Sequence, residues 1–100
     1  MKPYYAVIFT SLLSKDTEGY SEMGLKMKEL AEQQPGYLGF ESAREDIGIT
    51  ISYWESPEAI KAWKAELEHL KAQKMGRSKW YQQYTVRICK VEREYEFKRD

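Results

Sequence analysis

The sequence is poor in the residues that build metal and redox sites. It contains one histidine, His69, and one cysteine, Cys89, which lie twenty positions apart in different predicted elements. This spacing matches no zinc-binding pattern, and a single cysteine excludes an intrachain disulfide. The glycines form no phosphate-binding loop, since the nearest candidate, "GYLGF", lies inside a strand pattern. We therefore predict no metal and no cofactor, and we expect Cys89 to be a buried strand residue.

The chain also lacks an excess of charge of either sign and any long apolar run. Lys plus Arg and Asp plus Glu both number 16, so the formal net charge is zero, which argues against a nucleic-acid partner. The longest apolar run, Tyr4 to Phe9, is too short to cross a bilayer. With 42% hydrophobic residues in 100, we expect a single domain over residues 1–100, no membrane partner and a cytoplasmic location.

The periodicity predicts four strands and two helices. Period-two or β-branched runs predict strands over 4–11, 36–43, 48–54 and 84–97, whereas three- and four-residue spacing predicts helices from Tyr20 to "QQPG" and from Ser56 to about Met75. Ser56 and Pro57 suit the cap and first position of the second helix. The order β-α-β-β-α-β is that of the ferredoxin-like α+β fold. Right-handed crossovers place both helices on one face of its antiparallel sheet.

The strands are apolar on both faces, although two helices can cover only one. In the first strand Ala6 and Ile8 point one way and Val7 and Phe9 the other. Large apolar surfaces that the helices leave uncovered usually mark a partner surface. We therefore predict a homodimer in which two sheets pack face to face, with the last strands crossing between copies.

The role of His69 is open from the residues alone. On a helical wheel it lies about 130° from the centre of the apolar stripe between Trp63 and Leu67. This places it beside small residues rather than in the core. A structural or solvent-facing histidine and a catalytic histidine both fit that position, and catalysis further needs a substrate within hydrogen-bond reach.

The segment from Ser52 to Tyr95 resembles the antibiotic biosynthesis monooxygenase superfamily. The strand end Tyr53-Trp54 and the helix start Ser-x-Glu-Ala carry the resemblance, together with "QPGYLGFES" and a series of later residues: Trp63, His69, Gln73, Gly76-Arg77, Trp80-Tyr81, Tyr84 and Val91-Glu92-Arg93. The resemblance implies the dimeric α/β-barrel form of the ferredoxin-like fold.

The resemblance also implies an activity. Some members of this family oxidise polycyclic phenols with O2 and without metal or flavin, the substrate's own carbanion or phenolate supplying the electrons. By analogy, Trp63, His69 and Tyr84 are the predicted catalytic residues, and a small aromatic or quinone-like ligand would contact Trp54, Arg77, Trp80 and Tyr81. Two alternatives stay open: a non-enzymatic ligand-binding or stress-related dimer, and a haem-binding or haem-degrading protein. The haem-degrading branch has an Asn at the end of its first strand, where this chain has "FTSLL".

Overall fold

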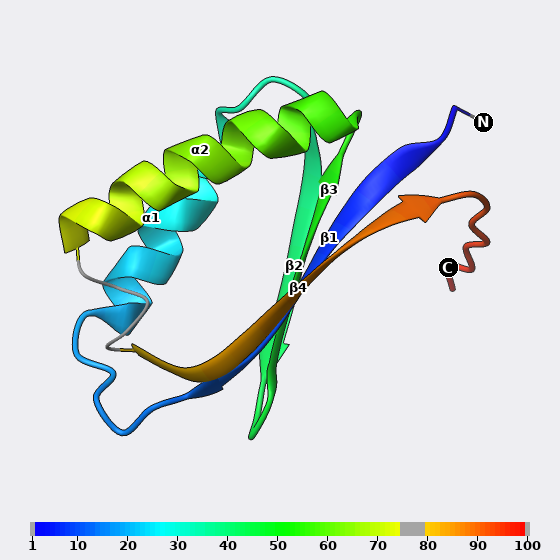
Figure 1. The fold of residues 1–100 in the computed structure, drawn as a ribbon. Helices are drawn as coiled ribbons and strands as arrows, with labels where there is room; N and C mark the ends of the chain where they lie inside the picture. Colours follow the sequence, from blue (N-terminus) through cyan, green and yellow to red (C-terminus); the bar gives the residue numbers. More distant parts are fainter. Residues whose placement is uncertain (1, 75–79, 100) are drawn as a thin grey trace.

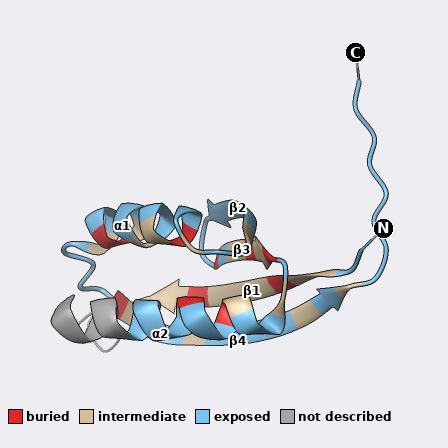
Figure 2. Cartoon of the chain, turned by 90° about the horizontal axis from the view of Figure 1, so that it is seen from above, coloured by how far each residue is buried: buried red, intermediate tan, exposed pale blue. Residues whose placement is uncertain are grey.

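The computed structural model describes residues 2–74 and 80–99, with the side chains of helical residues 69–74 outside this description. It has the expected order of elements (Figure 1). The elements are β1 (Tyr4–Leu13), α1 (Tyr20–Glu32), β2 (Tyr37–Arg44), β3 (Gly48–Trp54), α2 (Pro57–Lys74) and β4 (Tyr81–Val91). The strands form one antiparallel sheet in the order β2-β3-β1-β4. Both helices lie on the same side of that sheet, as Figures 1 and 2 show from two directions. The predicted ferredoxin-like α+β fold is confirmed.

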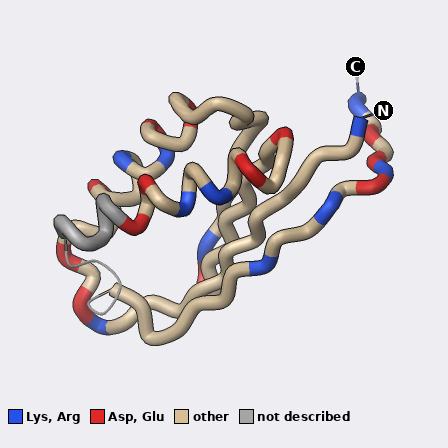
Figure 3. The backbone as a smooth tube through the Cα atoms, turned by 45° about the horizontal axis from the view of Figure 1, so that its top comes forward, with Lys and Arg blue, Asp and Glu red and all other residues tan. Residues whose placement is uncertain are grey.

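The two faces of the sheet follow from the register of the central strands. Tyr5 pairs with Trp54 and Val7 with Ser52, and these residues face the helices, where Tyr5 and Val7 pack against the core. Ile8 pairs with Ile51, and this pair points to the opposite side. We call the two sides the helix-side face and the open face. Neither central strand contains a charged residue, and Figure 3 shows the charges mainly on the helices, the β2–β3 turn and the C-terminal segment.

The helices begin where the sequence predicts. In α2, the backbone N–H of Ala59 donates to Ser56 Oγ at 3.1 Å, which is the expected N-cap bond. Ile60 and Trp63 are buried on its inner side. Helix α1 buries Met23 and Ala31. It ends at Glu32, with Gln33 as its C-cap, and Pro35 follows closely, which disfavours helical backbone at Gln34.

The strand ends differ from the sequence prediction in three of the four strands. β1 continues to Leu13 rather than ending at Ser11, and β2 spans Tyr37–Arg44 rather than the predicted 36–43. β4 begins at Tyr81, not Tyr84, and ends at Val91, not Phe97. The cause is the availability of partners: Leu13 pairs with Tyr81, and Val91 pairs with Tyr4 at the very start of β1. Beyond that point β4 has no neighbouring strand to continue the ladder.

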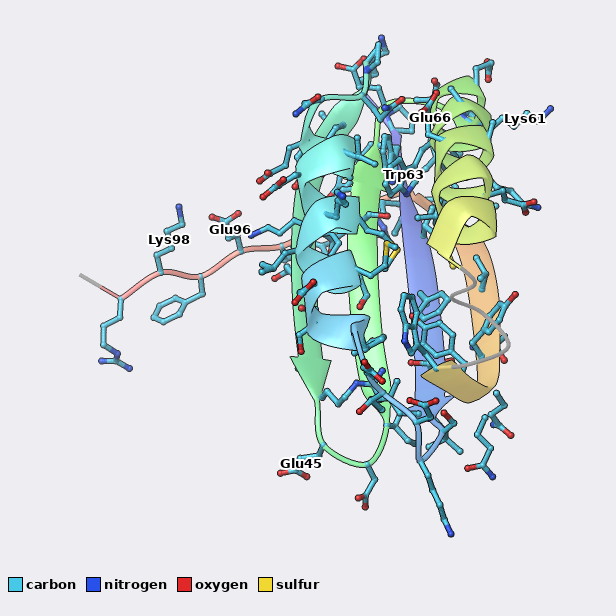
Figure 4. All side chains as sticks on the ribbon, turned by 90° about the vertical axis from the view of Figure 1, so that its left-hand side faces the viewer. Glu45, Lys61, Trp63, Glu66, Glu96 and Lys98 are labelled. Carbon is cyan, nitrogen blue, oxygen red and sulfur yellow. The ribbon has the colours of Figure 1, made fainter. Side chains whose placement is uncertain are left out.

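Residues 92–99 form an exposed C-terminal arm outside the ladder. The arm leaves the sheet on the side away from the helices (Figure 1). Tyr95 and Phe97 are 88% and 80% exposed, and an ion pair joins Lys98 Nζ to Glu96 Oε1 at 3.2 Å (Figure 4). The residues after Val91, which we had included in the predicted strand 84–97, are therefore a charged arm outside the sheet.

Replacing Gly36 with alanine should destabilise the fold by about 1–3 kcal/mol, because overpacking and a positive φ both oppose it. Gly36 has φ +88°, and an added Cβ would lie 2.7 Å from Ala59 Cβ, where the start of β2 meets the start of α2. Urea unfolding followed by circular dichroism measures the change in the free energy of unfolding.

The matched control is Gly24→Ala inside α1, where an added Cβ meets nothing within 4 Å. It should raise stability by about 0.5–1 kcal/mol, since alanine favours helix over glycine. Equal effects of the two substitutions would contradict the close approach at Gly36.

Candidate functional site

Two groups of aromatic side chains lie on the helix-side face, one towards each end of β1. The first group is part of the hydrophobic core. Trp54 is fully buried and stacks on Trp63 at 5.9 Å between ring centroids, with Tyr37 packed edge-on at 5.7 Å. Trp54 Nε1 donates to Ser52 Oγ at 2.8 Å, which satisfies the buried indole. Figure 4 shows Trp63 between α2 and the sheet.

The second group, which we call the aromatic cluster, gathers rings from three separate parts of the chain. Its members are Phe9 of β1, Tyr20 of α1, Trp80 immediately before β4, and Tyr81 and Tyr84 within β4. Phe9 stacks on Tyr84 at 5.3 Å, and Tyr81 packs edge-on against Phe9, Tyr20 and Tyr84 at 5.4, 5.8 and 5.6 Å. Offset and edge-on packing of this kind stabilises aromatic groups beyond simple burial.

Hydrogen bonds to backbone carbonyls hold one end of the cluster in place. Trp80 is 4% exposed, and its Nε1 donates to the carbonyl of Glu18 at 2.8 Å. The N–H of Ser14 in turn donates to the carbonyl of Trp80 at 2.7 Å. Trp80 thus joins the loop before α1 to the start of β4, and Tyr20 packs edge-on against it at 5.9 Å.

One cation, Arg44, adjoins the aromatic cluster. Arg44 pairs with Gly48 across the hairpin, and Gly48 pairs with Ser11 on β1. The guanidinium passes over Gly48, where no Cβ obstructs it, and donates to the buried Ser11 Oγ and to the Ser11 carbonyl, the latter at 3.4 Å. Nη2 also lies 3.4 Å from Tyr20 Oη, and the guanidinium carbon lies 5.8 Å from the Tyr20 ring centroid.

One tyrosine of the cluster, Tyr81, has a perturbed pKa. Burial raises the pKa of Tyr81 well above its usual value, and the neighbouring Tyr20 raises it further, while Arg44 acts in the opposite direction. A neutral phenol donates one hydrogen bond and also accepts. The cluster therefore offers hydroxyl groups and a guanidinium beside apolar rings.

Beside the cluster, the helix-side face includes apolar surface that is open to solvent. Val86 pairs with Phe9, and Ile88 pairs with Val7, so both point to the helix side. They nonetheless remain 48% and 58% exposed. An apolar ligand that contacted the aromatic cluster could extend over this surface.

The structure brings together three of the predicted site residues and separates two others from them. Trp80, Tyr81 and Tyr84 meet in the aromatic cluster, whereas Trp54 and Trp63 belong to the core group. His69 lies in α2 with its side chain outside the described part, and Arg77 lies outside the described residues.

Three residues of the cluster region were missed from the sequence: Phe9, Tyr20 and Arg44. The two rings had been assigned to a strand face and to the apolar stripe of a helix, which is correct but does not show that they meet. Arg44 had been left between the two predicted strands 36–43 and 48–54. The available signal was Gly48, four residues later, which leaves room for a long side chain to cross the hairpin.

The open face carries tyrosines that hydrogen-bond to carboxylates. Tyr53 Oη donates to Glu41 Oε1 at 2.8 Å, and this bond, with partial burial, raises the pKa of Tyr53 to about 12. Tyr4 Oη donates to Glu94 Oε2 of the C-terminal arm at 2.8 Å, which raises the pKa of Tyr4. The two rings pack edge-on at 5.9 Å.

The described residues offer little support for a ligand site elsewhere, a metal site or a membrane-spanning helix. An open pocket of about 250 Å³ lies at the Tyr4 end of β1, lined by Lys2, Pro3, Tyr4, Leu38 and Glu55, none of them a predicted site residue. Within residues 2–74 and 80–99, no three His, Cys, Asp or Glu side chains gather as a metal site requires. None of the helices described is both long and apolar enough to cross a bilayer.

Comparison with known proteins identifies relatives of this chain. The uncharacterized protein YqjZ of Bacillus subtilis (strain 168) is 51% identical over 94 residues, which cover 92% of this chain and 82% of that protein. Among solved structures, SnoaB, a cofactor-independent oxygenase from Streptomyces nogalater, superposes with a TM-score of 0.66 at 13% identity, covering 96% of this chain and 97% of SnoaB. Protein SO0527 from Shewanella oneidensis gives 0.75 at 8% identity, covering 91% and 93%.

These structural likenesses, at such low identity, establish the shared fold. Family assignment rests on the sequence itself, because the model of the antibiotic biosynthesis monooxygenase family matches residues 3–75. That match spans β1 to the end of α2 and includes the core tryptophans and Arg44. The chain therefore belongs to the antibiotic biosynthesis monooxygenase family.

Proposed function

We propose that this protein is a monooxygenase that oxidises a small aromatic or quinone-like substrate with O2 and without a cofactor. The aromatic cluster, continued by the exposed Val86 and Ile88, is the observation that carries the proposal. Rings and aliphatic side chains with a few polar groups are what a flat aromatic ligand requires. Family membership and the fold shared with SnoaB, itself a cofactor-independent oxygenase, support the same reaction class.

The proposed reaction balances without an external reductant. For a phenol that carries a ring methylene, a base removes a proton, and the resulting carbanion transfers electrons to O2. A carbon–oxygen bond forms, giving a hydroperoxide once a proton is returned. Loss of water then breaks the O–O bond and leaves a carbonyl. The methylene carbon is oxidised, one oxygen atom enters the product, and the other leaves as water.

In this proposal the protein supplies proton transfer and orientation. Tyr84, half-buried and stacked on Phe9, would polarise a substrate hydroxyl, and His69 of α2 would act as the base. Trp63 would fix the position of α2 against the sheet through its stack on Trp54. Trp80 and Tyr81 would contact the substrate rings, and Arg77 remains a proposed binding residue.

Oxygen uptake with a panel of phenols, quinols and anthrones tests the proposal. We expect the wild type to consume O2 with at least one of these compounds. His69→Ala and Tyr84→Phe should each lower the rate by about 10²-fold or more, the usual size of a general acid–base contribution. An oxygen electrode measures the rate, and mass spectrometry identifies the product.

The control is Lys61→Ala, since Lys61 lies on the same helix and points to solvent (Figure 4). It should keep the wild-type rate. A folded wild type that consumes no O2 with any compound would contradict the proposal and favour the non-enzymatic, ligand-binding alternative.

We also propose that the protein is a homodimer whose copies meet through their open faces. Ala6, Ile8, Ile49, Ile51, Cys89 and Val91 form an apolar patch there, and Ile49 is 43% exposed. Surfaces of this kind usually mark an interface. The C-terminal arm supports a second copy as the occupant, because it lies on the open side of the sheet with Tyr95 and Phe97 exposed (Figure 2).

A further inference from the structure

Arg44 lies against the aromatic cluster and crosses the backbone of the neighbouring strand β3. Its path from β2 to Ser11 on β1 passes directly over Gly48. A Cβ at that position would collide with the guanidinium carbon and with Nη2. The missing side chain at Gly48 thus leaves space for the Arg44 side chain to cross β3, and its guanidinium reaches Tyr20.

The charge of Arg44 has no acidic partner among the described residues. Its hydrogen bonds go to the hydroxyl and carbonyl oxygens of Ser11 and to Tyr20 Oη, all of them neutral. Among the described residues, an ion pair is formed elsewhere, between Glu96 and Lys98 in the C-terminal arm. A guanidinium has five N–H donors in a planar fork that suits a paired acceptor. Arg44 is also exposed, so a ligand can reach it.

We infer that Arg44 is a specificity-determining residue that binds an anionic oxygen of the ligand while the aromatic cluster holds its rings. The inference rests on the proposed function and narrows it, because it makes the preferred substrate an aromatic compound that carries an ionised hydroxyl or a carboxylate. Hydrogen bonds between charged partners are about twice as strong as those between neutral ones. The side chain therefore discriminates between an anion and a neutral molecule of the same shape.

This preference also suits the proposed chemistry. A phenol bound as its phenolate is already poised to give electrons to O2, and the guanidinium lowers the pKa of a bound phenol by favouring its charged form. Tyr20 lies next to Arg44, and the raised pKa of Tyr81, which packs on Tyr20, keeps the Tyr81 hydroxyl a neutral donor rather than a competing anion. The reacting oxygen would lie at the Arg44 end of the cluster.

Equilibrium binding of a matched pair of probes tests the inference without relying on turnover. 1-Naphthoate and 1-naphthamide have nearly the same shape, but only the first is charged at pH 7. Isothermal titration calorimetry should show that the wild type binds the naphthoate at least about tenfold more tightly, a difference of about 1.4 kcal/mol. Arg44→Gln should bring the two affinities together by weakening naphthoate binding alone.

Gly48→Ala provides a second variant, which keeps the Arg44 charge but fills the space that its side chain occupies. This variant should also lose the preference for naphthoate over naphthamide. Arg87→Gln is the matched control, since Arg87 pairs with Ile8 and lies on the open face. It should leave the preference unchanged. Circular dichroism establishes that each variant is folded.

Equal affinity of the wild type for both probes overturns the inference, as does a preference that survives in Arg44→Gln and Gly48→Ala. The inference is also overturned if the wild type binds neither probe. The result of this binding experiment does not depend on whether the protein consumes O2. Charge-selective binding without turnover would support the role of Arg44 and remove the monooxygenase proposal, whereas turnover without charge selectivity would do the reverse.

Discussion

Trp54→Ala should destabilise the protein by about 3–5 kcal/mol, the usual cost of removing a large aromatic side chain from a core. Trp54 is fully buried, stacks on Trp63 and packs against Tyr37. Its loss removes the contact between α2 and β3 and leaves Ser52 Oγ without the indole donor. A domain of this size has only about 5–15 kcal/mol of stability in total. Calorimetry should show the melting temperature falling by about 12 °C or more.

The control for Trp54 is Ile47→Ala, which also shortens a large apolar side chain. Ile47 lies in the β2–β3 turn and is 56% exposed, so its loss should change stability by about 0.5 kcal/mol or less. Both variants must be compared with the wild type at one protein concentration, because the stability of the proposed dimer would depend on concentration. A loss under about 1 kcal/mol for Trp54→Ala would contradict a core centred on this residue.

The elements that the sequence predicts well are those with local signals. β3 was predicted residue for residue, because Gly48 follows a turn and Trp54 precedes the Ser56 cap. The helix-side stripe of α2 was also predicted, since Ile60 and Trp63 follow the helical period. Such patterns need no knowledge of the rest of the chain.

The aromatic cluster depends instead on contacts between distant segments. Phe9 and Tyr84 meet because β1 and β4 pair in one register, and a shift of one residue would turn every side chain to the other face. Arg44 reaches Ser11 only because three strands align it with Gly48. A charged residue beside "EDIG" is typical of a turn, and nothing local indicates that it crosses the sheet.

The predicted site residues also divide into those that the sequence placed correctly and those whose position depends on contacts between distant segments. Trp80, Tyr81 and Tyr84 were chosen from the family resemblance and do lie together, although the predicted last strand began only at Tyr84 and so left Tyr81 outside it. Trp54 was chosen as a binding residue, but the structure places it in the core, where Trp63 and Tyr37 cover it. Its position at a strand end suggested access to a ligand. The register with Tyr5, however, turns it towards the helices.

Ile51→Lys should convert the proposed dimer to a monomer, raising the dissociation constant by about 100-fold or more, since moving a lysine charge from water into an apolar interface costs several kcal/mol. Ile51 lies on the open face of β3, between Ile8 and Glu41 on the neighbouring strands. A single copy leaves this position partly open to water, so the lysine should change the stability of the monomer little.

Sedimentation velocity across micromolar concentrations distinguishes the two states. The wild type should sediment at twice the chain mass of 11.9 kDa, and Ile51→Lys at the chain mass. Leu25→Lys is the matched control, because Leu25 is 66% exposed on α1, on the side of the sheet that the second copy does not cover. It should remain dimeric. A wild type that sediments as a single chain would remove the interface. Water would then have to solvate the apolar patch of the open face in every copy, at a cost that association avoids.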